Sequence, residues 1–407
     1  MSVRNAEIAD QEGRDVRQRD HPLSVFQVMP RNMYFGASRA TSIDLCVRDL
    51  VASSRYRSTT RILAEEIGDL FPGFSIEPLP SQARAATFAR ASHVARAAHR
   101  DLPDIIIVQQ HLPTAAAIAR RLPNAKIILH THNFQKGYET AGKVMQQLRR
   151  AIRKRRYAQL AGIIHVSETC ARSFAETWPD VGLPSAVVNN GLDFAVWRPA
   201  DARVPQILCV GRCAPEKGIL EAAQGVAAVL PKYPGWRARF ILSDVGVHPS
   251  YFERVRAALA ACGRQAEIQV QRPFAEVKAA YEQAAIALVP SRWTEPFGRT
   301  ALEAHAGGAA LISSGTGGLA EISGEGALML PEVTPDAIAG AIAMLIADQP
   351  LREGLAHKGA AQARAHFGIE MQAARLDAFC ATIARQSDTT RPSNCPPAVH
   401  FQHDARH

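Results

Sequence analysis

The sequence predicts an α/β protein of two doubly wound, Rossmann-like domains, each a parallel sheet wrapped by helices. Short apolar runs alternate with helical patterns along the chain, which is typical of parallel strands connected by helices. The 407 residues exceed one ordinary domain and suit two of about 150 to 200 residues each. The alternation also restarts near the middle of the chain, after a proline-containing segment at 198–201.

The apolar runs that we predict as strands fall into two groups. In the first half they are 24–28, 104–108, 125–129, 161–166 and 185–190. In the second half they are 206–210, 237–242, 266–270, 285–290, 309–313 and 326–330. Helices are expected between these runs, notably from near Pro215, Tyr251, Phe274, Phe297 and Pro335.

The two groups divide the chain into five segments. We expect an N-terminal domain at 22–198 and a C-terminal domain at 203–365, followed by a helix at 366–385 that could return to the N-terminal domain. The polar ends at 1–21 and 386–407 have no periodicity and are expected to be disordered tails.

Composition excludes several classes of protein. No run approaches the roughly 18 apolar residues of a membrane-spanning helix, and the charged start has no apolar signal-peptide core. Seven cysteines without a CxxC pair argue against a disulfide framework or a zinc site. A cytoplasmic location is therefore expected.

The formal charge of +9 is concentrated in the first half of the chain, where residues 22–160 carry 21 Lys and Arg against 9 Asp and Glu. The run 143–156 has seven cations and no carboxylate, interspersed with Val144, Met145, Leu148 and Ile152. A basic amphipathic helix of this kind can lie on an anionic membrane surface, which would place the protein at the inner face of the membrane. A solvated helix face is the alternative. No recognition motif indicates nucleic-acid binding.

The loop after the predicted strand 206–210 has the features of an anion-binding site. Ligands of open α/β sheets bind beyond the carboxyl ends of the strands. Gly211 permits a tight exit, and Arg212 and Lys217 bracket the start of the next helix, whose free N–H groups favour an anion. Arg offers a bidentate fork to phosphate oxygens, whereas Lys offers a compact charge. Two exposed cations on a surface loop are the alternative.

A second strand exit, at 290–303, carries two glutamates. Glu295 lies at its mouth, and Glu303 follows eight residues later, at a spacing that lets both border one cleft. Carboxylates accept strong hydrogen bonds from sugar or ribose hydroxyls, although a charge near a helix start has an ordinary capping role. The downstream loop 313–321 contains glycines that allow close approach by a ligand, or simply form a turn.

In combination, four segments resemble the retaining, nucleotide-sugar-dependent glycosyltransferases of the GT-B fold, family 4. They are 190–193, 211–218, 295–303 and 317–321, in that order. The N-terminal half matches only loosely. The resemblance implies that the C-terminal domain binds a nucleotide-sugar donor, which is a substrate and not a cofactor. It also implies that the N-terminal domain binds the acceptor.

The resemblance also implies roles for individual donor-site residues. Arg212 and Lys217 would bind the donor diphosphate, and Glu303 would bind the nucleotide ribose. The transferred sugar would be held by Glu295 together with the backbone at Phe297 and Gly298. Gly318 and, in the loop 34–39, Gly36 complete the expected donor contacts. Arg299, Thr300 and His305 depart from the family's usual apolar residues.

The family's N-terminal-domain histidine corresponds best to His132, which follows a predicted strand. His130 and His111 are rivals for this role, and a purely structural histidine is the alternative. His130 and His132 form an HxH pair, but no third ligand is evident, so no metal site is expected.

The expected activity is retaining transfer of a hexose-type sugar to a hydroxyl acceptor, in cell-surface polysaccharide, lipopolysaccharide or glycolipid synthesis. Fixed cations would stabilise the departing diphosphate without a metal. A lipid-linked or lipopolysaccharide-type acceptor would suit a membrane-bound helix. Two alternatives stay open: a GT-B nucleotide-sugar epimerase, which needs no acceptor, and a non-catalytic nucleotide-sugar-binding protein.

Overall fold

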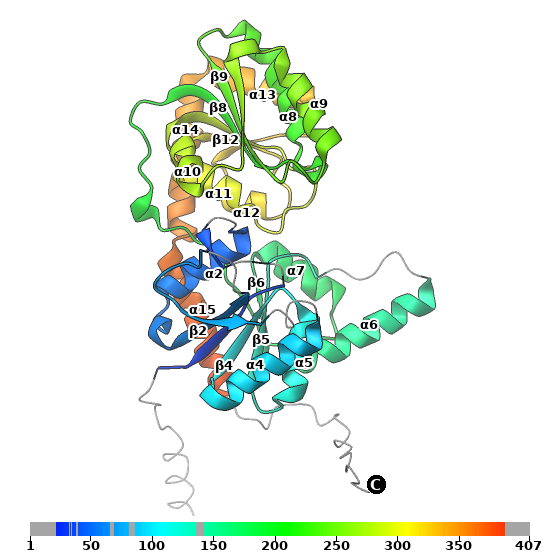
Figure 1. Cartoon of the computed structure of the whole chain (residues 1–407). Helices are drawn as coiled ribbons and strands as arrows, with labels where there is room; N and C mark the ends of the chain where they lie inside the picture. Colours follow the sequence, from blue (N-terminus) through cyan, green and yellow to red (C-terminus); the bar gives the residue numbers. More distant parts are fainter. Residues whose placement is uncertain are drawn as a thin grey trace, which may run out of the picture.

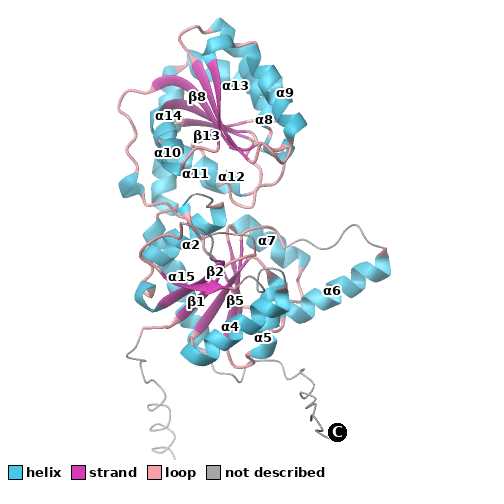
Figure 2. Ribbon diagram, viewed as in Figure 1, coloured by secondary structure: helices cyan, strands magenta, loops and turns pink. Residues whose placement is uncertain are grey.

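The chain forms two parallel sheets flanked by helices, as the computed structural model shows (Figures 1 and 2). The structure describes residues 22–31, 33, 35–37, 40–65, 69–80, 86–135 and 142–386. The expected tails at 1–21 and 386–407 lie outside these residues, apart from residue 386. Within the described residues, no helix is both long and apolar enough to cross a membrane. The prediction of two doubly wound α/β domains is confirmed.

The N-terminal sheet has seven parallel strands in the order β3-β2-β1-β4-β5-β6-β7. They are β1 (Val25–Val28), β2 (Thr60–Glu65), β3 (Ser75–Leu79), β4 (Ile105–Gln109), β5 (Lys126–Thr131), β6 (Gly162–His165) and β7 (Ser185–Val187). The helices that precede or connect them are α2 (Ser42–Ser53), α4 (Thr87–Asp101), α5 (Leu112–Arg121), α6 (Lys143–Tyr157) and α7 (Glu168–Thr177).

The C-terminal sheet has six parallel strands in the order β10-β9-β8-β11-β12-β13. They are β8 (Val204–Arg212), β9 (Arg237–Ser243), β10 (Ala266–Val270), β11 (Ala284–Val289), β12 (Ala310–Ser313) and β13 (Ala327–Met329). The helices are α8 (Ile219–Val229), α9 (Pro249–Ala260), α10 (Phe274–Gln283), α11 (Arg299–Ala306), α12 (Gly318–Ser323), α13 (Pro335–Ala347), α14 (Gln349–His366) and α15 (Ile369–Arg385).

Each sheet has a topological switch point, where the strand order reverses. In the C-terminal sheet it lies between β8 and β11, and in the N-terminal sheet between β1 and β4. A crevice forms at such a point because the connections from the two neighbouring strands leave in opposite directions. The loops after β8 and β11 are the two that the sequence marks as a phosphate and sugar site.

The two strands that the sequence analysis missed are β2 and β3. In β2 the apolar run is interrupted by Arg61 and ends at Glu65. Strand β3 lies at the sheet edge, is half exposed and contains Pro78, which an edge strand tolerates because proline has no N–H to donate and one side of the strand pairs with no neighbour. The predicted helix from Pro215 is also wrong in detail: Pro215–Lys217 is a short 3-10 turn, and α8 begins at Ile219.

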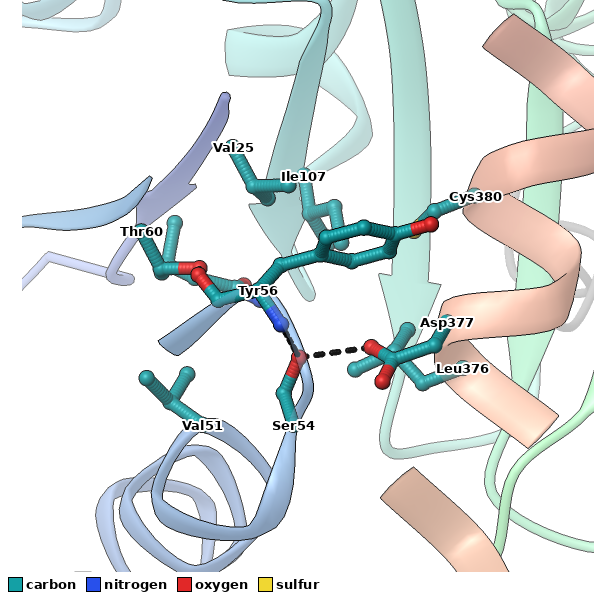
Figure 3. Close-up of a pocket in the computed structure, with 10 residues that line it drawn as sticks. Val25, Val51, Ser54, Tyr56, Thr60, Ile107, Leu376, Asp377 and Cys380 are labelled. Carbon is teal, nitrogen blue, oxygen red and sulfur yellow. Dashed lines mark hydrogen bonds between the residues drawn. The ribbon is translucent and has the colours of Figure 1, made fainter. Parts of the chain in front are cut away.

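The C-terminal helix α15 packs against the N-terminal domain. Its apolar face, which includes Leu376 and Cys380, joins a buried cluster with Val25 and Ile107 of the N-terminal sheet. Asp377 fixes the contact, because its carboxylate accepts from Ser54 Oγ at 2.6 Å and from the backbone N–H of residue 55 at 2.9 Å. Figure 3 shows these groups beside a small pocket between α15 and the end of α2. This packing joins α15, which follows the C-terminal domain in the sequence, to the N-terminal domain.

One departure from the family pattern, His305, is a core residue of α11. Its side chain is buried, and Nε2 lies 3.2 Å from the hydroxyl oxygen of Ser323. Burial lowers the pKa of His305 to about 4, so the ring is neutral at neutral pH.

This buried histidine predicts acid sensitivity. As pH falls below about 6.5, His305 binds a proton in the unfolded chain, whereas in the native protein it stays neutral until about pH 4. The unfolding free energy therefore falls on acidification. In His305→Gln, the loss of unfolding free energy between pH 7 and pH 5 should be smaller by about 2 kcal/mol, measured by urea denaturation. The exposed His357→Gln should keep the wild-type pH dependence. An equal effect of the two variants would contradict this assignment.

Candidate active site

The loops after β8 and β11 are joined by hydrogen bonds at the switch point of the C-terminal sheet. The backbone N–H of Arg292 donates to the carbonyl of Glu216 at 2.9 Å, and Ser291 Oγ donates to the same oxygen at 3.3 Å. Gly218 makes this approach possible. Its φ is +67°, and a Cβ there would overlap the carbonyl of Pro290. The two loops therefore form one rigid unit.

This unit pairs Lys217 with Glu295. Lys217 Nζ lies 2.6 Å from Glu295 Oε1, which also accepts from the hydroxyl of buried Ser291 at 2.6 Å. The Lys217 ammonium lies 5.5 Å from the centre of the Trp293 ring, which adds a cation–π contact. An ammonium has three N–H donors, so this pairing leaves Lys217 able to donate to a phosphate as well.

Arg212 lies at the end of β8 and is more open to solvent than Lys217. Its side chain is half exposed and pairs with Glu216 at 3.2 Å across the turn. An exposed ion pair of this kind contributes little to stability, so the guanidinium can exchange Glu216 for a phosphate at low cost. Arg212 and Lys217, the two cations predicted to bind the diphosphate, thus both border the joined loops after β8 and β11.

Glu303, in α11, is buried and paired with Arg299. Arg299 Nε donates to Glu303 Oε1 at 2.8 Å, and Arg299 Nη2 lies 3.4 Å from Asp49 of α2 in the N-terminal domain. Burial raises the pKa of Glu303, while the Arg299 charge lowers it part of the way back. Arg299, which the sequence analysis noted only as a departure, therefore connects the expected ribose carboxylate to the opposite domain.

The glycine-rich loop packs on the Glu295 loop. Gly317 pairs with Glu295 in a parallel bridge, and the N–H of Gly318 donates to the Glu295 carbonyl at 2.8 Å. A Cβ on Gly318 would overlap the backbone of Phe297, itself buried. Gly298 has a φ of +104° and precedes the first residue of α11. The close approach that Gly317 and Gly318 permit is thus to the protein's own backbone.

On the N-terminal side, His132 follows β5 and is half-buried. Its Nε2 lies 2.7 Å from Gln109 Oε1, while Gln109 Nε2 donates to Gln27 at 2.7 Å. Because Gln109 presents its oxygen to the ring, we assign the proton to Nε2, which leaves Nδ1 as an acceptor. Burial lowers the pKa of His132 to about 3, so the ring is neutral.

The rival histidines have other surroundings. His130 is fully buried, its ring centre 4.3 Å from that of His132. His111 caps α5 by accepting from the N–H of Thr114 at 3.3 Å. Among the described residues, no group of three or more His, Cys, Asp or Glu side chains could hold a metal ion. His132 is therefore the strongest of the three candidates for a substrate contact.

Gly36 lies in the loop after β1, paired with Leu70 in an antiparallel bridge. A Cβ there would overlap the carbonyl of Asp69, so this glycine also serves a close backbone contact. Of the expected loop 34–39, residues 34, 38 and 39 lie outside the described part of the chain.

The glycine-rich loop also contacts the N-terminal domain. Glu321 of α12 accepts from the N–H groups of Glu168 and Thr169 at 3.0 and 2.5 Å, at the N-terminus of α7. Ser167 Oγ donates to the carbonyl of Pro296 at 2.5 Å. A carboxylate at a helix start is stabilised by free N–H groups and the helix dipole. Sequence reasoning gave Glu321 no role, since nothing in its own segment identifies its partner.

A cavity of about 290 Å3 lies at this domain boundary. It is lined by residues of both domains, namely Phe134, Thr169, Arg172, Ser173, Glu176 and Thr294. Phe134 follows His132 by two positions, and Thr294 directly precedes Glu295. The lining of the cavity thus includes a residue close in sequence to each of these two site residues, although neither His132 nor Glu295 lines it.

Two Rossmann-like domains, with a paired cation and carboxylate at the switch point of the second, define a GT-B glycosyltransferase. Family models match both domains: "Glycosyltransferase Family 4" over residues 50–196 and "Glycosyl transferases group 1" over residues 198–362. Together these matches cover most of the chain, which belongs to the glycosyltransferases that the two models describe.

One relative of known description agrees with this assignment, and two solved structures share the fold. A lipopolysaccharide core biosynthesis mannosyltransferase of Rhizobium leguminosarum bv. viciae is 27% identical over 48% of this chain, and the match spans only 59% of that relative. The sucrose-phosphate synthase of Thermosynechococcus elongatus superposes with a TM-score of 0.70 at 18% identity, covering 88% of this chain and 99% of its own. Anabaena HepE, solved with UDP and glucose, superposes with a TM-score of 0.69 at 16% identity, covering 88% and 100%.

The Arg299 bridge predicts a stability effect. Arg299→Leu leaves Glu303 buried without its partner, so the unfolding free energy should fall by about 3–5 kcal/mol in urea denaturation. Adding Glu303→Gln should restore much of it, because the unpaired charge is then removed. Arg256→Leu, which breaks the exposed pair with Glu253, should change stability by about 1 kcal/mol or less. If Arg299→Leu proved as stable as wild type, the ion pairs of Arg299 would make no net contribution to stability.

Proposed function

We propose that this protein transfers a hexose-type sugar, with retention, from a nucleotide-sugar donor to a hydroxyl acceptor. The observation that supports it most is the 2.6 Å pairing of Lys217 with Glu295 at the switch point of the C-terminal sheet. Open α/β sheets bind ligands at such points. A cation and a carboxylate side by side suit a ligand that carries a phosphate next to sugar hydroxyls.

The proposed chemistry depends on charge that develops as the glycosyl–phosphate bond breaks. Negative charge grows on the departing diphosphate, and positions fixed before the reaction stabilise it most effectively. Lys217 is held by Glu295 and Trp293 and needs little reorganisation, while Arg212 supplies a second, more mobile cation. We propose that these two residues perform this stabilisation without a metal ion.

The donor's sugar and nucleoside would lie on either side of these cations. Glu295 would accept from sugar hydroxyls, with the backbone at Phe297 and Gly298 closing the sugar pocket. Glu303 would accept from the ribose, which requires the carboxylate to share its hydrogen bonds with Arg299. Neutral His132 would face the sugar from the N-terminal domain through its unprotonated Nδ1.

We place the acceptor at the boundary cavity, whose lining includes the sequence neighbours Phe134 of His132 and Thr294 of Glu295. Arg172 and Thr169 in its lining can bind polar or anionic groups of an acceptor. A lipopolysaccharide-type or lipid-linked sugar fits this proposal, since a relative at 27% identity is described as a lipopolysaccharide core mannosyltransferase. Such an acceptor would place the protein at the inner face of the membrane.

Donor hydrolysis tests the assignment, because it needs no acceptor. Against a panel of uridine-, guanosine- and adenosine-diphosphate sugars, Lys217→Ala and Arg212→Ala should lower kcat/KM roughly 100- to 1000-fold. Glu295→Gln should lower kcat while leaving nucleoside diphosphate affinity within about threefold. The exposed controls Lys358→Ala and Arg256→Ala should match wild type. Wild-type rates in the Lys217 and Arg212 variants would refute the proposal.

Product analysis distinguishes an epimerase from a transferase. A transferase gives a labelled acceptor product that depends on the added acceptor, whereas an epimerase releases a free sugar isomer without one. Release of the isomer alone would replace sugar transfer with epimerisation at the same donor site.

A further inference from the structure

Helix α6 extends away from the body of the N-terminal domain (Figure 1). Its final residue, Tyr157, is buried and its hydroxyl donates to Gln135 at 3.2 Å. One turn earlier, Arg153 donates to the same side-chain oxygen, and the Arg150 guanidinium lies 4.8 Å from the centre of the Trp178 ring. The second half of the helix is thus anchored, whereas the side chains of its first two turns are exposed.

The anchored and exposed faces of α6 are opposite each other. At about 100° per residue, Arg150, Arg153 and Tyr157 fall within one arc of roughly 60°. The apolar residues Val144, Met145, Leu148 and Ile152 fall within another arc of about 100°, centred roughly 180° away. Val144 is 81% exposed and Leu148 is 53% exposed. The apolar stripe is therefore exposed, and none of its four residues belongs to a hydrophobic cluster of the described residues.

Cations accompany this stripe. Arg155 lies within its arc and Arg156 at its border by the same helical spacing. The helix has seven Lys and Arg in residues 143–156 and no Asp or Glu. The outward face therefore combines apolar side chains with positive charge that no carboxylate of the helix itself balances, while Lys154 pairs with Asp180 of the domain at 3.3 Å.

We propose that this face of α6 docks on a membrane leaflet that carries anionic lipid head groups. Such a leaflet supplies acyl chains for the apolar stripe and negative charge for the flanking cations. A second copy of the chain would bring like charges together. Nucleic acid would satisfy the cations but leave the apolar stripe in water.

Docking here would also hold the N-terminal domain at the leaflet. Because this domain contributes most of the lining of the proposed acceptor cavity, a lipid-linked acceptor would then be close to it, a consequence that rests on the proposed function.

Vesicle co-sedimentation of the full chain tests the docking without donor or acceptor. Wild type should bind vesicles of two parts phosphatidylcholine to one part phosphatidylglycerol, should bind pure phosphatidylcholine far more weakly, and should lose binding as salt is raised. Val144→Ser/Leu148→Ser/Ile152→Ser should weaken partitioning at least about tenfold. Arg155→Gln/Arg156→Gln should weaken it roughly 30-fold, at about fivefold per cation.

Matched variants on the C-terminal domain control for exposure and charge. Val204→Ser/Val247→Ser/Met344→Ser removes exposed apolar side chains, and Lys232→Gln/Lys358→Gln removes exposed cations; both should bind like wild type. Equal binding of the α6 variants and these controls would overturn the proposal. The proposal would also be overturned if wild type proved dimeric and the α6 apolar variant became monomeric while still binding vesicles, because the apolar face would then join two copies of the chain. The α6 apolar variant should hydrolyse donor at the wild-type rate. Vesicle binding and donor hydrolysis are therefore independent measurements, and a failure of the proposed function would not affect the test of docking.

Discussion

The contact of Gly218 with the Pro290 carbonyl is the constraint on which the candidate site depends. A side chain at this position would separate the loops after β8 and β11. Their approach sets the 2.6 Å pairing of Lys217 with Glu295 and the shared hydrogen bonds to the Glu216 carbonyl. A cation and a carboxylate from segments 78 residues apart are thereby fixed before any ligand arrives.

The segments after β11 and β12 also contact the N-terminal domain. Glu321 caps α7 from the glycine-rich loop, Pro296 accepts from Ser167, and Arg299 reaches Asp49 from the start of α11. Each contact lies within a few residues of a proposed donor contact. Because a donor would compete with Arg299 for Glu303, donor binding and the domain interface are expected to be coupled.

The fold was predictable because its signals are local: continuous apolar runs such as Ile105–Ile107 identify buried parallel strands. The cation pattern at the exit of β8 predicts an anion site, and its role in donor binding stays a prediction. β3 was missed because a half-exposed edge strand with Pro78 lacks that pattern. The partners of Arg299 and Glu321 were also missed, because an ion pair or a hydrogen bond between domains has no signature in either segment.

The most direct measurement is calorimetric titration of nucleoside mono- and diphosphates into wild type and Lys217→Ala. If Lys217 holds the diphosphate, the variant should lose about 100-fold in diphosphate affinity and little in monophosphate affinity. Glu295→Gln should not reproduce this pattern. An equal loss for both nucleotides, or none for either, would contradict the claim that Lys217 and Glu295 form the phosphate and sugar halves of one donor site.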